Sequence, residues 1–231
     1  FEFKRGKSVT LHRPQGVKAA RLVFAACGAA TAKSVKAAFA AGFAALKGGG
    51  ARHVAVALAG VGELSAAHSE ALVAAVTDAT YVYRHTKPSA PAAARLNQVT
   101  LVCAKAQAAS MVRGLRQGQA VAAGVGLARE TANRPANHVT PSALARQAKQ
   151  LGKQHGFKVE VFDRKQIEKI GMGSFLAVAQ GSEEPPRFIV MHYQGAAKGE
   201  APIVLIGKGI TFDSGGISLK TGAEMDEMKF D

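Results

Sequence analysis

Short apolar runs separated by alanine-rich stretches organise the first hundred residues of the chain. The runs have the length and composition of buried strands, and the stretches between them repeat apolar residues at helical spacing. The strand-like runs lie at 17–26, 53–58 and 97–104, and the helix-like stretches at 32–46 and 64–84. Alternation of strands and helices favours a parallel sheet covered by helices. The pattern therefore predicts a mixed α/β N-terminal domain over residues 1–104.

A single long helix is predicted to follow this domain. Residues 107–132 keep apolar positions at helical spacing and contain no proline. At about 1.5 Å per residue such a helix measures roughly 39 Å, a length that suits a connector between domains. The connecting segment is therefore assigned to 105–132, and the sequence NRPAN at 133–137 ends it.

The remaining residues have the pattern of a second α/β domain over 133–231. Thr140 and Pro141 have the form of an N-cap followed by proline at the first helical position, which predicts a helix to about His155. A strand is predicted at 158–162 and a short helix at 164–170, closed by Gly171. Three further apolar runs are predicted to be sheet strands, with a loop at 194–201 that permits a hairpin or a mixed sheet. They lie at 175–179, 188–193 and 203–206.

Composition favours a soluble intracellular protein. The apolar runs fall well short of the roughly 18 to 20 residues that span a bilayer. The chain starts at Phe1 without the pattern of a signal peptide. Cys27 and Cys103 each lie in an apolar stretch, where a reduced thiol packs as a small hydrophobic group. We therefore expect a cytoplasmic location and no membrane partner.

Basic residues are concentrated in the first half of the chain. The net charge is +14, and residues 1–130 hold 17 Lys and Arg against 5 Asp and Glu, whereas 131–231 hold 13 against 11. An excess of this size can bind phosphate backbones, or it can form a solvated face. The basic residues are scattered and have no aromatic interleaving. A DNA-binding or architectural protein remains the alternative function, with or without enzymatic activity.

Lysines and aspartates that could serve in catalysis or ligand binding are concentrated at the C-terminal end, in the segment APIVLIGKGITFDSGGISLKTGAEMDEMKFD. Two lysines and two aspartates accompany a glycine-rich stretch directly after an apolar run. In open α/β sheets, sites lie where core strands end. These four residues are Lys208, Asp213, Lys220 and Asp231.

Three other interpretations of this glycine-rich stretch fail or remain incomplete. A phosphate-binding loop needs Ser or Thr after the lysine, where Gly209 stands, and a dinucleotide motif needs glycine at Phe212. A nucleophile elbow around Ser214 also needs glycine at position 212. Glycines that only form turns would not explain the two lysines and two aspartates nearby.

The motifs GKGITFDSGGISLK and EMDEMKFD closely resemble the signature of the M17 leucyl aminopeptidase family. Two upstream segments resemble it as well, NRPANHVTP at 133–141 and GMGSFLAVAQGS at 171–182. The resemblance is specific in residue type and spacing from 133 onward. Before that point the chain is similar to the family only in its α/β pattern and its long helix.

This resemblance implies the start of an α/β/α metallopeptidase domain that releases leucine-like residues from the N-terminus of peptides. It implies two divalent ions, Mn or Zn, with Lys208 and Asp231 on one ion and Asp213 bridging both, and bicarbonate as a further component. Lys220 is implied to be catalytic and to contact substrate. Met228 is implied to line the pocket for the first side chain of the substrate.

The resemblance also implies a homohexamer, and it implies more metal ligands than this sequence supplies. A lysine amine ligates a metal only when it is neutral, which a neighbouring dication favours, so Lys208 and Lys220 would have opposite roles. In the family the remaining carboxylate ligands follow the position of Asp231. The 231 residues therefore lack the full ligand set.

Overall fold

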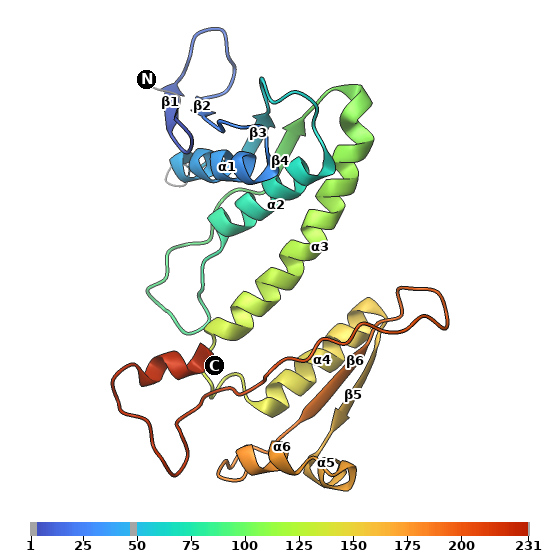
Figure 1. Cartoon of the computed structure of the whole chain (residues 1–231). Coiled ribbons are helices and arrows are strands. Elements are labelled where there is room, and N and C mark those ends of the chain that lie inside the picture. Colours follow the sequence, from blue (N-terminus) through green and yellow to red (C-terminus); the bar gives the residue numbers. More distant parts are fainter. Residues whose placement is uncertain (1–3, 47–49, 231) are drawn as a thin grey trace. The chain divides into compact units, whose positions relative to one another are not determined.

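The computed structural model describes residues 4–46 and 50–230, and within it the chain forms two compact units (Figure 1). The first unit comprises Phe1–Glu130 and the second Thr131–Asp231. Within the described ranges, no helix is long and apolar enough to cross a membrane.

The first unit contains four strands and three α-helices in its described residues. In chain order these are β1 (Ser8–His12), β2 (Arg21–Ala25), α1 (Ala32–Leu46), β3 (His53–Ala57), α2 (Ala66–Thr80), β4 (Gln98–Val102) and α3 (Ala108–Asn133). β1 pairs with β2 antiparallel, and β3 pairs with β4 in parallel. The predicted parallel layer is confirmed, whereas β1 has no counterpart among the predicted strands. Helix α2 is shorter than predicted, because Tyr81 has an extended backbone that ends it.

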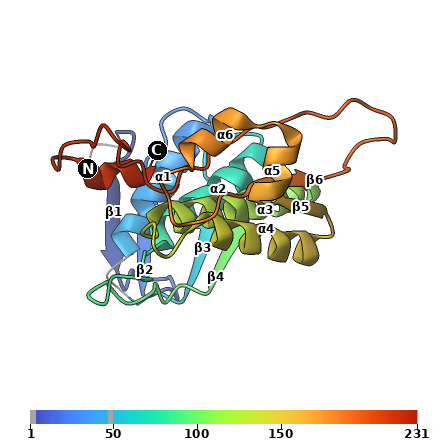
Figure 2. The ribbon, with the colours of Figure 1, turned by 90° about the horizontal axis from the view of Figure 1, so that it is seen from below.

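The core of this unit lies where α1 and α2, side by side, cover β3 and β4 (Figures 1 and 2). Helix α1 contributes Val35, Phe39 and Phe43, spaced four residues apart on one face. Leu72 contributes from α2 and is only 2% exposed. Both cysteines are free thiols that pack, partly buried, against this core.

Helix α3 approaches α2 closely because glycine stands at the contact. Gly114 is buried, and a Cβ added there would collide with the carbonyl oxygen of Ala66 and with Ser69 Oγ. This proximity lets the buried Ser69 hydroxyl lie 2.8 Å from Ala66 O and 3.0 Å from Met111 O. The hydroxyl thereby links the two helices.

Replacing Gly114 with alanine is expected to destabilise the protein, because the added methyl group overpacks the contact between α2 and α3. We expect a loss of about 1–3 kcal/mol in the free energy of unfolding, measured by urea denaturation. Gly124→Ala is the matched control, since a Cβ at Gly124 meets open space. It should stabilise the helix by about 0.5–1 kcal/mol. Equal effects of the two substitutions would contradict the steric explanation.

A polar cluster joins α1, α2 and α3 around Asp78. Arg129 Nη2 lies 2.7 Å from Asp78 Oδ1, and Lys36 Nζ lies 3.3 Å from Oδ2. The Arg129 guanidinium also lies over the Tyr81 ring, 4.9 Å from its centroid. The hydrogen bond from Arg129, with a further contribution from Lys36, holds the pKa of Asp78 below its ordinary value despite some burial. The ionised carboxylate therefore favours the folded state.

The contribution of Asp78 to stability should depend on pH. A lowered carboxyl pKa stabilises the fold above the unfolded value of about 3.9, and this stabilisation disappears as pH falls through the folded value. Because Asp78 is 44% exposed, Asp78→Asn should lower the unfolding free energy at pH 7 by only about 0.5 kcal/mol. Unfolding curves from pH 7 to 2 should show the difference from wild type shrinking at the acid end. Glu63→Gln, at an exposed carboxyl of the same unit, is the control for the change of charge.

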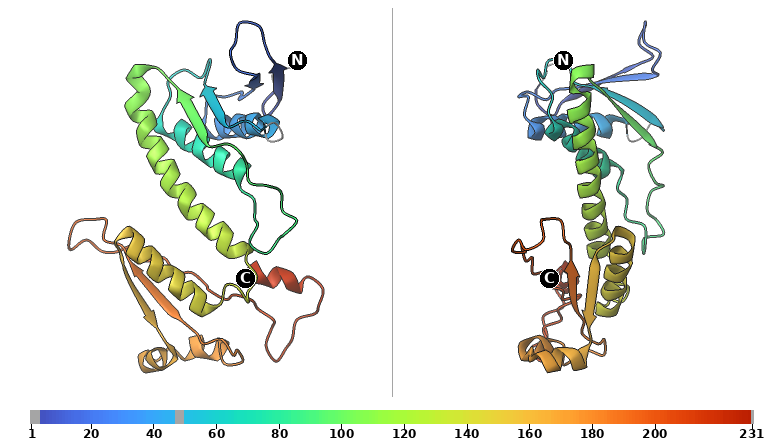
Figure 3. Two further views of the ribbon diagram at one scale, coloured as in Figure 1. Left: turned by 180° about the vertical axis from the view of Figure 1, so that it is seen from behind. Right: turned by 90° about the vertical axis from the view of Figure 1, so that its right-hand side faces the viewer.

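The second unit is built on an antiparallel pair of strands with α4 packed against it (Figure 3). Its elements are α4 (Pro141–His155), β5 (Lys158–Phe162), α5 (Arg164–Ile170), α6 (Gly173–Val178) and β6 (Phe188–His192). The predicted N-cap is confirmed, because Thr140 Oγ1 accepts a hydrogen bond from Ala143 N at 3.2 Å. Gly171 ends α5 with φ of +85°, as predicted.

Two predicted strands of this unit are wrong. The run at 175–179 belongs to α6, where Leu176 N donates to Met172 O at 3.2 Å and closes a local turn. The run at 203–206 is not a strand, and its four side chains are between 72% and 95% exposed. Short apolar runs do not distinguish strand from helix, and a strand needs a neighbour for its backbone groups. No strand pairs with 203–206 in the described part of the chain.

Candidate functional site

The glycine-rich segment of the second unit folds into a loop that rests on the 3-10 helix Met225–Phe230. Asp213 N donates to Met228 O at 3.3 Å, which fixes the start of the loop to this helix. Lys220 N donates to Ser214 O at 2.9 Å and closes the loop on itself. Gly215 N donates to Asp213 Oδ1 at 2.9 Å. The backbone therefore sets the direction of the Asp213 carboxylate.

Three of the predicted site residues meet in this loop. Lys220 Nζ lies 3.2 Å from Asp213 Oδ2 and 2.8 Å from Met228 Sδ. The Lys220 and Asp213 side chains are 39% and 35% exposed, so water and a substrate can reach both. An ammonium group has three N–H donors. Asp213 and Met228 face two of them, and the third can serve another oxygen atom.

The structure says less about the other two predicted metal ligands, Lys208 and Asp231. Lys208 lies on the exposed extended segment that leads to Asp213. Asp231 lies outside the described residues. The roles assigned to both remain predictions.

Backbone hydrogen bonds also shape this site, and a motif made of residue types does not predict them. The carbonyl oxygens of Ser214 and Met228 hold Lys220 and Asp213 through their backbone amides. The visible signal in the sequence is the glycine pair at 215 and 216, whose φ values are +94° and +71°. Such values suit glycine and strain other residues.

The donor atoms present are suited to divalent metals, although they do not complete a site. Lys208 offers a nitrogen when deprotonated, and Asp213 offers carboxylate oxygens, a combination that Mn and Zn accept. Among the described residues, no cluster of three or more His, Cys, Asp or Glu side chains could hold an ion. The residues fit the chemistry but form only part of a ligand set.

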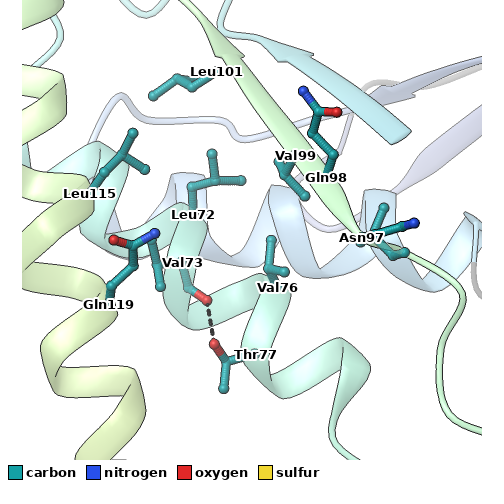
Figure 4. Close-up of a pocket in the computed structure, with 11 residues that line it drawn as sticks. Leu72, Val73, Val76, Thr77, Asn97, Gln98, Val99, Leu101, Leu115 and Gln119 are labelled. Atoms are coloured by element: carbon teal, nitrogen blue, oxygen red, sulfur yellow. Dashed lines mark hydrogen bonds between the residues drawn. The ribbon is translucent and has the colours of Figure 1, made fainter. Parts of the chain in front are cut away.

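A cavity of about 250 Å³ in the first unit has a different character (Figure 4). It lies between α2, β4 and α3, and Leu72, Val99 and Leu115 supply apolar walls. Thr77 and Gln119 are among its polar lining residues. Among the described residues, no carboxylate, lysine, histidine or thiol lines it, so it offers no acid–base group.

Comparison with known families accounts for most of the chain. Residues 126–231 match the catalytic domain of the cytosol aminopeptidase family, and residues 1–89 match the N-terminal domain of the same family. A probable cytosol aminopeptidase of Methylibium petroleiphilum is 59% identical over 99% of this chain and 47% of its own length. One of Polaromonas naphthalenivorans is 49% identical over 100% of this chain and 45% of its own length. The chain thus spans about half the length of these relatives.

Solved structures show the same similarity in three dimensions. The bottromycin maturation enzyme BotP in complex with Mn matches with a TM-score of 0.80 and 30% identity, over 100% of this chain and 48% of that one. A mutant of tomato leucine aminopeptidase matches with a TM-score of 0.68 and 30% identity, over 82% of this chain and 38% of that one. The family resemblance and the mixed α/β class predicted from the sequence are confirmed. The chain belongs to the cytosol aminopeptidase family, a family of metallopeptidases, and carries its N-terminal domain and the start of its catalytic domain.

Proposed function

We propose that the protein containing this chain is a two-metal aminopeptidase that releases leucine-like residues from the N-terminus of peptides. The observation that carries the proposal is the convergence of Asp213 and Lys220, in the glycine-rich loop, with Met228 of the adjoining 3-10 helix. A carboxylate, an ammonium group and an apolar thioether supply a metal ligand, a stabiliser of negative charge and a hydrophobic contact. The first two groups serve the hydrolysis of a peptide bond, and the third serves the choice of substrate.

The metal-holding residues in this proposal are Lys208, Asp213 and Asp231. When bound, two Mn or Zn ions would polarise the scissile carbonyl and lower the pKa of a shared water, with bicarbonate as a proposed further component. Three side chains are too few for two ions. We therefore assign the activity to the full-length protein rather than to these 231 residues alone.

Lys220 is proposed to stabilise the negative charge that develops on the substrate carbonyl oxygen. Its ammonium group is held by Asp213 Oδ2 and Met228 Sδ and keeps one N–H for that oxygen. Hydrogen-bond donors fixed in advance at such a position typically lower the activation free energy by a few kcal/mol. Lys220 therefore acts on the transition state more than on the bound substrate.

Met228 is proposed to contact the first side chain of the peptide. Its sulfur lies 2.8 Å from Lys220 Nζ, so a side chain packed on this thioether would lie beside the reacting carbonyl. An unbranched thioether adapts to aliphatic side chains. This contact favours leucine-like residues. We further propose a homohexamer, as the family resemblance implies, and a cytoplasmic location, in keeping with relatives named as cytosol aminopeptidases.

Metal-dependent hydrolysis of leucyl amide by the full-length protein tests the proposal. Asp213→Ala should reduce kcat/KM with added Mn or Zn by more than about 100-fold, beyond the loss caused by removing a group that only orients a ligand. Asp226→Ala removes an exposed carboxylate of the adjoining 3-10 helix and is the matched control. Activity that survives Asp213→Ala, or an inactive wild-type enzyme, would contradict the proposal.

A second candidate function rests on the charge of the β1–β2 hairpin. Residues 4–26 contain six Lys and Arg and no Asp or Glu, and five of these basic residues are exposed. An arm of this charge can bind duplex DNA through its phosphates, with or without the peptidase activity. The basic residues of the hairpin are Lys4, Arg5, Lys7, Arg13, Lys18 and Arg21.

DNA binding by this hairpin predicts a steep dependence on salt. The affinity of the protein for duplex DNA, measured by fluorescence anisotropy, should fall as salt rises. Replacing Lys7 and Lys18 together with alanine should lower the slope of log K against log salt by about 2. Replacing Lys165 and Lys169 on α5 makes the same change in net charge and should leave the slope unchanged. Absence of binding at low salt would remove this function.

A further inference from the structure

We infer that Gly215 is a positioning residue for catalysis, because it sets Asp213 and Lys220 at their working separation. The inference rests on the proposed function and extends it to a residue that supplies no side chain. Gly215 donates its backbone N–H to Asp213, and its lack of a side chain leaves space for Lys220. It therefore couples a proposed metal ligand to a proposed catalytic ammonium group.

On one side Gly215 directs the carboxylate. Its N–H donates to Asp213 Oδ1 at 2.9 Å, which leaves Oδ2 turned toward Lys220 Nζ at 3.2 Å. The bond links two residues that are only two positions apart, so the turn between them must be tight. Directly after this turn the chain continues with a φ of +94° at Gly215.

On its other side Gly215 provides the space that Lys220 occupies. A Cβ at position 215 would lie 2.9 Å from Lys220 N and 3.0 Å from Lys220 Cγ, and it would collide with Ser218 O. Two of these atoms are backbone atoms of a loop closed by the Lys220 N–H bond to Ser214 O. They cannot rotate away as the end of a flexible side chain could. A side chain at 215 would therefore push Lys220 away from Asp213 and Met228.

Gly216 shows that conformational freedom and space are separate requirements here. Its φ is +71°, so it also favours glycine, but a Cβ at that position meets nothing within 4 Å. Substitution of Gly216 strains the backbone without a collision. Substitution of Gly215 causes both effects. The two glycines thus form a matched pair for an experiment.

The test compares Gly215→Ala and Gly216→Ala in the full-length enzyme with Mn. Misplacement of a reacting group by about 1 Å costs about 100-fold in rate. We expect kcat of Gly215→Ala to fall by about that factor while KM changes little, since Lys220 acts on the transition state. The inhibition constant of the tetrahedral analogue leucine phosphonic acid should rise by a similar factor, and that of leucine should not. Gly216→Ala should change each quantity far less.

A double-mutant cycle separates positioning from general damage. In a Lys220→Ala background, Gly215→Ala should cause little further loss of kcat, because the substitution keeps the N–H that Asp213 Oδ1 accepts and its collision displaces Lys220. Additive losses would overturn the inference. So would equal effects of the two glycine substitutions, or a lowered Tm of Gly215→Ala with wild-type kcat.

A second measurement covers the case in which Gly215→Ala does not fold. In the metal-free full-length protein, hydrogen exchange can follow the backbone amides of Gly215 and Lys220. Asp213→Ala removes the acceptor of the Gly215 amide and should lower the protection of both amides together, relative to Asp226→Ala. Unchanged protection at Lys220 would overturn the coupling. An inactive wild-type enzyme would instead count against the proposed function, and this exchange result would still decide the coupling.

Discussion

At Gly114 the backbone of α3 comes so close to α2 that no Cβ fits, and the Ser69 hydroxyl bridges the two helices. The position of α3 in the first unit depends on this contact. Further along α3, Arg129 pairs with Asp78 and lies over Tyr81. The steric contact and the ion pair act at different points along the same two helices. Close backbone packing therefore fixes α3 near Gly114, and an ion pair fixes it near Arg129.

The candidate site also depends on a glycine at which a Cβ would not fit, and there the absence of a side chain affects the chemistry. Gly215 has no side chain, and Lys220 occupies the space that one would need. The ammonium group then lies within reach of both Asp213 and Met228. In water such a pair of charges contributes little to stability, because both side chains are more than a third exposed. The proposed role of this ion pair is to place the Lys220 ammonium group for the reaction.

Among its described residues, the second unit leaves one apolar run exposed and supplies only part of a metal-ligand set. The apolar side chains at 203–206 are largely exposed, and the donor groups near Asp213 make only part of a ligand set. Both features agree with the comparison to relatives about twice as long. Burial of this run and completion of a two-metal site both require further neighbours. The proposed chemistry therefore needs more ligands than the described residues supply.

Local features of the sequence determined much of the secondary structure and the choice of site residues. Helix α1 has the predicted bounds, Thr140 and Gly171 cap helices as expected, and Asp213, Lys220 and Met228 meet in the predicted segment. These signals act over a few residues or lie in residue types at fixed spacing. Tertiary structure alone decided that 203–206 lacks a partner strand and that Gly215 makes room for Lys220. Those outcomes depend on which atoms lie nearby, and spacing along the chain does not contain that information.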